Sequence, residues 1–237
     1  MNQPHLGMYI HIHWGYNHPY AARTWTLDDW RSYAGGLVAL GFDLVMIWPM
    51  LEIIPDPPTE SDIAHLTKIS QVIDLLHSEF GMKVLITLGA NVMGNERAKE
   101  FSFEKRPYFQ CDLRLDPKNE DDVNKLMRFR NGLYSYLAKA DGCSIIDSDP
   151  GGYIGSTNDE FTNLLWRHID MMRKHNPEAV LYYWMWMGWE AYNKMWKDAQ
   201  EGAHHRFDTT TADFEPIISR LMQRPQEPWR VLSCQPI

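Results

Sequence analysis

The sequence lacks long hydrophobic runs, clustered cysteines and any stretch rich in basic residues. None of its apolar runs approaches the ~18 residues of a membrane-spanning helix, so no membrane partner is expected. The net charge is −8 at pH 7, and a phosphate backbone would be repelled, so no nucleic-acid partner is expected. The three cysteines, Cys111, Cys143 and Cys234, lie far apart, which argues against a disulfide framework and against a thiolate zinc cluster.

Two further kinds of sequence feature are missing. The first residues, Met1 to His5, contain neither the basic nor the apolar part of a secretory leader, so a cytoplasmic location is expected unless a leader was left off. No glycine-rich phosphate loop follows any predicted strand, which argues against a nucleotide-binding, doubly wound sheet. We therefore expect no cofactor.

Aromatic residues, by contrast, are abundant. Ten Trp, eleven Tyr and nine Phe would overfill an ordinary core of a chain of 237 residues. Two explanations are open at this point. The rings form a Trp-rich core, or some of them form a surface that grips flat, partly apolar ligands such as sugars.

Short apolar runs alternate with amphipathic stretches along the whole chain. The predicted strands are Met8–His13, Asp43–Trp48, Lys83–Asn91, Cys143–Asp149, Val180–Met187 and Val231–Cys234. The predicted helices are Thr26–Leu40, Ser61–Phe80, one that opens at Asp116-Pro117, and one that runs from the capping box at Thr157 to Pro177. This repetition predicts an α/β fold of the (β/α)₈, TIM-barrel type, because polar and aromatic residues follow several different strands.

A closed barrel needs eight strands, and the pattern supplies six. Either two strands escape detection, or the chain is the first three-quarters of a longer protein; the second is favoured because the pattern stops just after a strand. Residues 1–237 are expected to form a single catalytic barrel domain. Residues 94–115 are too long for an ordinary connection and are predicted to be an active-site loop insertion.

The first strand places Tyr9, His11 and His13 on one face, because side chains alternate along a strand. Two histidines at a barrel mouth are consistent with a metal pair of the amidohydrolase kind, with hydrogen bonding to substrate hydroxyls, or with buried structural residues. A metal site needs further ligands on later strands. The fifth strand offers none, so we predict that no metal is required.

The fourth strand ends in two acids, Asp147 and Asp149, whose Cα atoms would lie about 6.6 Å apart along a strand. Two carboxylates that close repel each other and should titrate apart, as paired acids do in glycosidic-bond cleavage. The alternative is that one caps the next turn and the other pairs with an arginine. We predict that both are catalytic.

Aromatic and polar side chains at other strand ends predict a sugar-binding rim. Tyr182, Trp184 and Trp186 share one face of the fifth strand and would form a stacking wall, although a buried core position is the alternative. The other predicted substrate-binding residues are His11, His13, Trp14, Trp48, Glu52, Asn91 and Glu190.

Residues 7–19, which read GMYIHIHWGYNHP, resemble the first-strand segment of α-L-fucosidases, approximately G-x-F-x-H-W-G-x-x-S-x-P. That resemblance implies a retaining barrel glycosidase in which His13, just before Trp14, binds the sugar and Asp147 or Asp149 is the nucleophile. The Lys-His-His-Asp-Gly-Phe stretch of that family is absent, since Ile47-Trp48-Pro49 stands there.

The fourth strand is also similar to the corresponding strand of chitinases and β-N-acetylhexosaminidases, with Asp141-Gly142 ahead of the acid pair. The glutamate that ends the motif in those families is missing, because Pro150 follows Asp149. The predicted function is a glycoside hydrolase that acts on the O-glycosidic bonds of a carbohydrate. The alternatives are a metal-dependent amidohydrolase that uses His11 and His13, and a sugar-binding barrel without catalysis.

Overall fold

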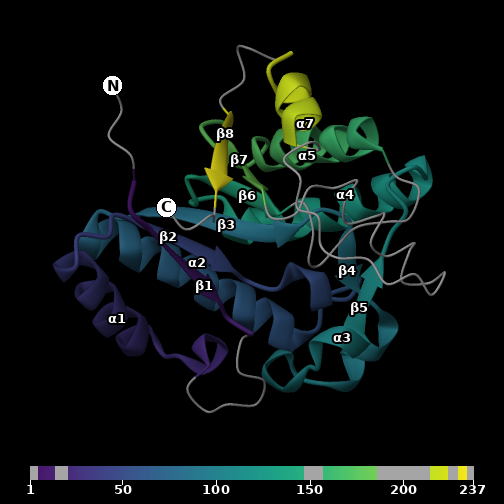
Figure 1. Ribbon diagram of the computed structural model, residues 1–237. Helices are drawn as coiled ribbons and strands as arrows, with labels where there is room; N and C mark the ends of the chain where they lie inside the picture. Colours follow the sequence, from purple (N-terminus) through teal and green to yellow (C-terminus); the bar gives the residue numbers. More distant parts are fainter. Residues whose placement is uncertain (1–4, 14–20, 147–156, 186–213, 224–228, 234–237) are drawn as a thin grey trace, which may run out of the picture.

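The computed structural model describes residues 5–13, 21–146, 157–185, 214–223 and 229–233 (Figure 1). Six strands form one sheet in the order β1-β2-β3-β6-β7-β8, and every neighbouring pair is parallel. Their bounds are β1 Gly7–His11, β2 Leu44–Trp48, β3 Lys83–Gly89, β6 Gly142–Ile146, β7 Val180–Met185 and β8 Trp229–Ser233. The six predicted strands are confirmed, with ends that shift by a few residues.

The sheet curves into a partial barrel, as contacts between distant strands show. Three strands separate β1 from β7 in the sheet order, yet the rings of Tyr9 and Trp184 meet with centroids 4.8 Å apart. The opposite face of the same strands points to the helices, because Tyr183 of β7 contacts Phe161 of the helix that precedes it. An inner face closed by aromatic rings and an outer face covered by helices define the TIM-barrel type of α/β fold.

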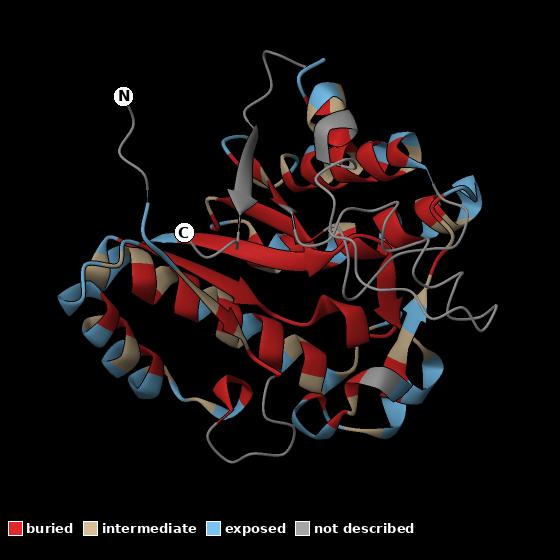
Figure 2. Cartoon of the chain, in the orientation of Figure 1, coloured by how far each residue is buried: buried red, intermediate tan, exposed pale blue. Residues whose placement is uncertain are grey.

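Helices follow the strands and cover the outer side of the sheet (Figure 1). Neighbouring helices pack in pairs, α1 on α2, α4 on α5 and α5 on α7. The sides of the helices that face the sheet are buried, and their other sides are exposed (Figure 2). The α-helices are α1 Leu27–Ala39, α2 Glu60–Phe80, α3 Tyr108–Cys111, α4 Glu120–Tyr134, α5 Asn158–Met172 and α7 Phe214–Leu221. Short 3₁₀ helices are η1 Ala22–Thr24, η2 Leu51–Ile53, η3 Glu96–Glu100, η4 Phe103–Lys105 and η5 Ser135–Leu137. In the described part of the chain, no helix is both long and apolar enough to cross a membrane.

The capping patterns locate most helix starts. Capping boxes begin α1 at Thr26 and α5 at Thr157, as predicted, and a further box at Thr59 begins α2 before the predicted Ser61. The prediction that the third helix opens at Asp116-Pro117 is wrong. The Asp116 side chain accepts from Lys118 N at 2.9 Å in a local turn, and α4 starts after Asn119 instead.

Residues 94–115, called here the 94–115 segment, form a long insertion that two short antiparallel strands close at its base. Val92–Gly94 (β4) pairs with Asp112–Arg114 (β5), and η3, η4 and α3 lie between them. Gly94 fixes this segment against the turn after β2, because its N–H donates to Ile54 O at 2.9 Å and an added Cβ would lie 2.4 Å from Ile54 C. Only glycine permits that approach.

Candidate active site

Four rings meet inside the barrel toward the carboxyl ends of its strands. Tyr9 and His11 come from β1, Trp48 from the end of β2 and Trp184 from β7. His11 lies 4.9 Å from Trp48 between ring centroids, and Tyr9 lies 6.2 Å from Trp48 and 4.8 Å from Trp184. Barrel enzymes build their sites at this end, so this aromatic cluster marks the candidate site.

His11 is a neutral imidazole in this cluster. Burial, and secondarily the neighbouring His13, lowers the pKa of His11 to about 3. The His13 N–H donates to His11 Nδ1 at 3.1 Å, so the proton of the neutral ring is on Nε2. Nε2 therefore carries the ring N–H of His11.

His13 turns away from His11 toward the 94–115 segment. Strand β1 ends at His11, so the alternation that would place both rings on one face does not reach His13. His13 Nε2 donates to Arg106 O at 2.9 Å, and the ring approaches Phe103. Because that nitrogen donates, Arg23 Nη1 at 3.5 Å cannot also donate to it, and burial lowers the pKa of His13 to about 4.

Glu52 is fully buried beside Trp48. Its Oε2 accepts from Trp48 Nε1 at 2.9 Å, and its Oε1 accepts from Gly89 N at 2.6 Å. Arg130 Nη2 lies 3.6 Å from Oε1, with both side chains 0% exposed. The carboxylate therefore binds protein donors at the ends of β2 and β3.

Two other predicted site residues are also buried. Trp184 is 2% exposed, which matches the buried core position that the sequence left open as the alternative to a stacking wall. Asn91, 1% exposed, donates from Nδ2 to Leu115 O at 2.8 Å and ties the end of β3 to the base of the 94–115 segment. Their roles in substrate binding stay predictions.

Five predicted site residues lie outside the described residues, and their roles stay predictions: Trp14, Asp147, Asp149, Trp186 and Glu190. Within the described residues, no group of three or more His, Cys, Asp or Glu side chains comes together to hold a metal ion.

A buried ion pair that no sequence pattern indicated anchors the 94–115 segment. Arg106 donates to Asp62 Oδ1 at 2.5 Å, and both side chains are fully buried. The other guanidinium N–H groups donate to three backbone carbonyls, those of Ile53, Ala98 and Phe101. The capping box at Thr59, which ends in Asp62, was the one local feature that could have located half of this pair.

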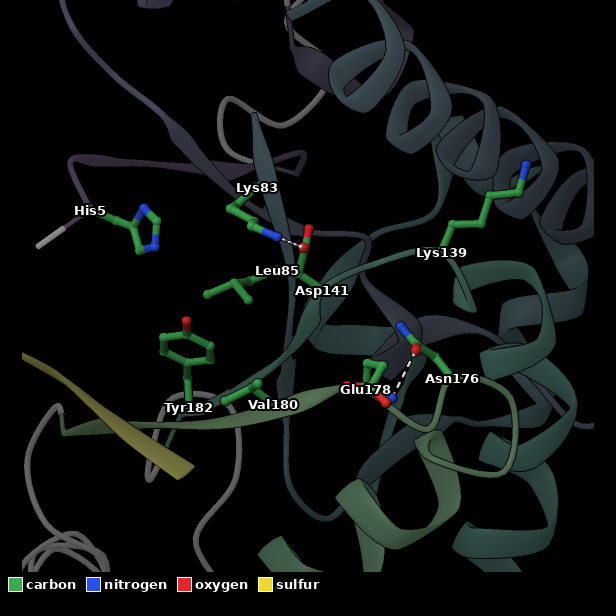
Figure 3. A pocket seen from close by; sticks show the side chains of 9 residues that line it. All are labelled: His5, Lys83, Leu85, Lys139, Asp141, Asn176, Glu178, Val180 and Tyr182. Atoms are coloured by element: carbon green, nitrogen blue, oxygen red, sulfur yellow. Dashed lines mark hydrogen bonds and ion pairs between the residues drawn. The ribbon is translucent and has the colours of Figure 1, made fainter. Parts of the chain in front are cut away.

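A cavity of about 340 Å³ lies at the opposite end of the barrel (Figure 3). It is lined by residues at the amino ends of the strands, among them Lys83, Asp141 and Val180. Lys83 Nζ lies 2.6 Å from Asp141 Oδ1, and His77 Nε2 lies 2.8 Å from Asp141 Oδ2, so these polar groups already bind each other. We place the candidate site at the carboxyl ends, where barrel enzymes carry their chemistry.

Two fully buried histidines should make the fold sensitive to acid. Burial lowers the pKa of His65 and of His168 from 6.5 to about 3. A histidine with a depressed pKa in the folded state contributes stability above pH 6.5 that is lost as the pH falls toward 3. We expect the unfolding free energy to drop by about 2 kcal/mol per histidine between pH 7.5 and pH 5, measured by urea denaturation.

The variant His168→Gln provides the comparison for that prediction. His168 donates from Nε2 to Ala90 O at 2.6 Å and accepts from Tyr134 O–H at 2.7 Å, contacts that a glutamine amide can imitate. The variant should lose about half of the pH dependence assigned to the two rings. A pH dependence equal to that of the parent would contradict the assignment.

Comparison with known proteins finds similarity in structure but not in sequence. No model of a known protein family matches the sequence, and no curated protein matches it. The GH5_18 enzyme from Streptomyces cattleya in complex with GlcNAc has a TM-score of 0.52 over 76% of this chain, at 16% identity. A family 20 β-N-acetylglucosaminidase has a TM-score of 0.54 over 97% of this chain, at 9% identity. A cycloisomaltooligosaccharide glucanotransferase from Paenibacillus sp. has a TM-score of 0.53 over 96% of this chain, at 12% identity.

The chain thus has the α/β fold of TIM-barrel glycoside hydrolases. It spans 44%, 52% and 38% of the lengths of those three chains. Likeness at such identities defines the fold and leaves the activity to be argued from the site. None of these three structures is a fucosidase, so the resemblance of residues 7–19 to α-L-fucosidases stays a prediction.

Proposed function

We propose that this chain carries the site of a glycoside hydrolase that acts on the O-glycosidic bonds of a carbohydrate. The observation that carries the proposal is the aromatic cluster at the carboxyl ends of a barrel whose structural neighbours are carbohydrate-active enzymes. Sugars present apolar ring faces and hydroxyl edges, so a site for them combines aromatic rings with a few fixed polar groups.

His11 supplies the fixed polar group in this proposal. Its neutral ring donates from Nε2, and Nδ1 is held by His13 N. A neutral donor suits a sugar hydroxyl, because the hydroxyl oxygen accepts a hydrogen bond without the cost of desolvating a charge. Tyr9 and Trp48 pack beside His11 and provide the aromatic surroundings.

The cleavage step is assigned to Asp147 and Asp149. Both follow β6 in the sequence, and β6 is the fourth strand in the sheet order. Glycosidic-bond cleavage uses two carboxyl groups, one as general acid and one as nucleophile or general base. The position of this pair after a buried strand of the barrel supports that assignment.

A panel of nitrophenyl glycosides tests the proposal. We expect turnover of at least one member, unaffected by a chelator; loss of turnover with the chelator favours the metal-dependent alternative, and binding without turnover favours the sugar-binding alternative. In His11→Phe, which keeps an aromatic ring beside Trp48 but removes the donor, kcat/KM should fall on the order of tenfold. The matched control is His5→Phe, at the opposite end of the barrel, with kcat/KM unchanged.

A further inference from the structure

The turn that follows β2 brings Glu52 back to the indole of Trp48. Met50 lies in the left-handed region, with φ 61° and ψ 48°, which residues with a side chain rarely adopt because of the Cβ clash. This conformation lets the chain reverse into η2, so that Glu52 reaches Trp48 four residues earlier. Strained backbone persists where the surrounding contacts over-determine it, and such places often serve a site.

The carboxylate of Glu52 makes use of both of its oxygens. Oε2 accepts from the indole N–H of Trp48, and Oε1 accepts from the backbone N–H of Gly89. Glutamine would have one acceptor oxygen, and its NH₂ group would face one of these two donors. The site therefore requires a carboxylate rather than any polar side chain of that length.

The indole held by Glu52 is the surface against which His11 packs. The centroids of the Trp48 and His11 rings lie 4.9 Å apart, with an angle of 39° between the ring planes. Trp48 is 3% exposed, so its ring cannot rotate without displacing its neighbours. The contacts run in series from Glu52 to Trp48 and from Trp48 to His11.

We propose that Glu52 is a positioning residue for sugar binding, which fixes the Trp48 indole and through it the ring of His11. This role differs from direct contact with a substrate, because the buried carboxylate is occupied by protein donors. This inference rests on the proposed function only in taking the ligand to be a sugar. The series of contacts from Glu52 through Trp48 to His11, called here the relay, belongs to the ligand-free protein.

Nuclear magnetic resonance of the ligand-free protein tests the relay. The Trp48 indole N–H and the His11 ring C–H are assigned from their loss in Trp48→Phe and His11→Phe. In Glu52→Gln both resonances should shift, and hydrogen exchange at the Trp48 indole should accelerate by about tenfold or more. Glu178→Gln, an exposed charge removal at the far end of the barrel, is the matched control and should move neither resonance.

A double-mutant cycle separates positioning from a general structural effect. In the Trp48→Phe background, Glu52→Gln should leave the His11 resonance where it is, because the connecting donor is gone. A His11 resonance that does not move in Glu52→Gln, or that moves equally in both backgrounds, overturns the relay. If Glu52→Gln does not fold, Glu52→Asp replaces it. Its shortened carboxylate cannot reach both donors, so the same displacement of His11 is expected.

The kinetic arm connects the relay to binding. On the best glycoside, Glu52→Gln should raise KM on the order of tenfold and leave kcat within about threefold, because the residue acts on binding geometry. An unchanged KM with a shifted His11 overturns the positioning role while the glycosidase proposal stands. Absence of turnover on every glycoside overturns the proposed function alone, and the resonance measurements then decide the relay.

Discussion

Replacing Arg106 by methionine should lower the unfolding free energy by about 3–5 kcal/mol, the usual cost of removing one partner of a buried ion pair. Arg106 and Asp62 are both 0% exposed, and their closest atoms, Nη1 and Oδ1, lie 2.5 Å apart. The methionine fills much of the volume but leaves the Asp62 carboxylate with only the Thr59 donors. Urea denaturation followed by circular dichroism measures the loss.

Two further variants make that experiment specific. Arg31→Met removes an exposed arginine that pairs with Glu79, and it should cost much less than Arg106→Met, because solvent screens an exposed pair. The double variant Arg106→Met with Asp62→Asn should recover part of the loss, because it also removes the buried charge that had lost its partner. Equal costs for Arg106→Met and Arg31→Met would show that the buried pair contributes no more than a surface pair.

The Arg106–Asp62 pair also shows what the sequence could not predict. The two residues are 44 positions apart, and no periodic pattern in the sequence indicates that they form a pair. The same holds for Glu52 and Arg130 of α4, which lie far apart in the sequence but pair in the folded chain. Hydrophobic periodicity and capping residues report local structure, whereas pairs between distant segments form only when the barrel closes.

The local elements, by contrast, could be predicted. The strands β2 and β6 are short apolar runs in which every residue is buried, and such runs keep their identity wherever they pack. The capping boxes at Thr26 and Thr157 satisfy orphan N–H groups within one turn, so they need no tertiary partner. The helix expected from Asp116 failed because Asp116 accepts a bond within a competing local turn.

The sequence predicted where in the barrel the candidate site lies, but only part of how its side chains are oriented and buried. Strand ends located His11 and Trp48, because the carboxyl ends of parallel strands meet at one rim. The direction of His13 was not predictable, since β1 ends at His11 and alternation fails beyond a strand. The burial of Trp184 was not predictable either, because the contact with Tyr9 that covers it spans the barrel.

Replacing Asp147 or Asp149 by asparagine should remove most turnover, with a loss on the order of 10²–10⁴-fold in kcat. Each supplies, in the proposed function, a proton or a nucleophilic oxygen that an amide cannot replace. Asparagine has the same shape as aspartate and relieves the repulsion between two acids close in sequence, so the melting temperature should stay the same or rise. Initial rates on the best glycoside and thermal melts measure both effects.

Asp28→Asn is the matched control for the acid pair, since its side chain is 89% exposed and lies in the first turn of α1. It should change neither kcat nor KM. Retention of sugar binding in the Asp147 and Asp149 variants would separate catalysis from recognition, because binding is assigned to His11 and its aromatic neighbours. Near-parental rates in both variants would remove the pair from the mechanism. Glu52 could not then take its place, because its two oxygens are already bound to Trp48 and Gly89.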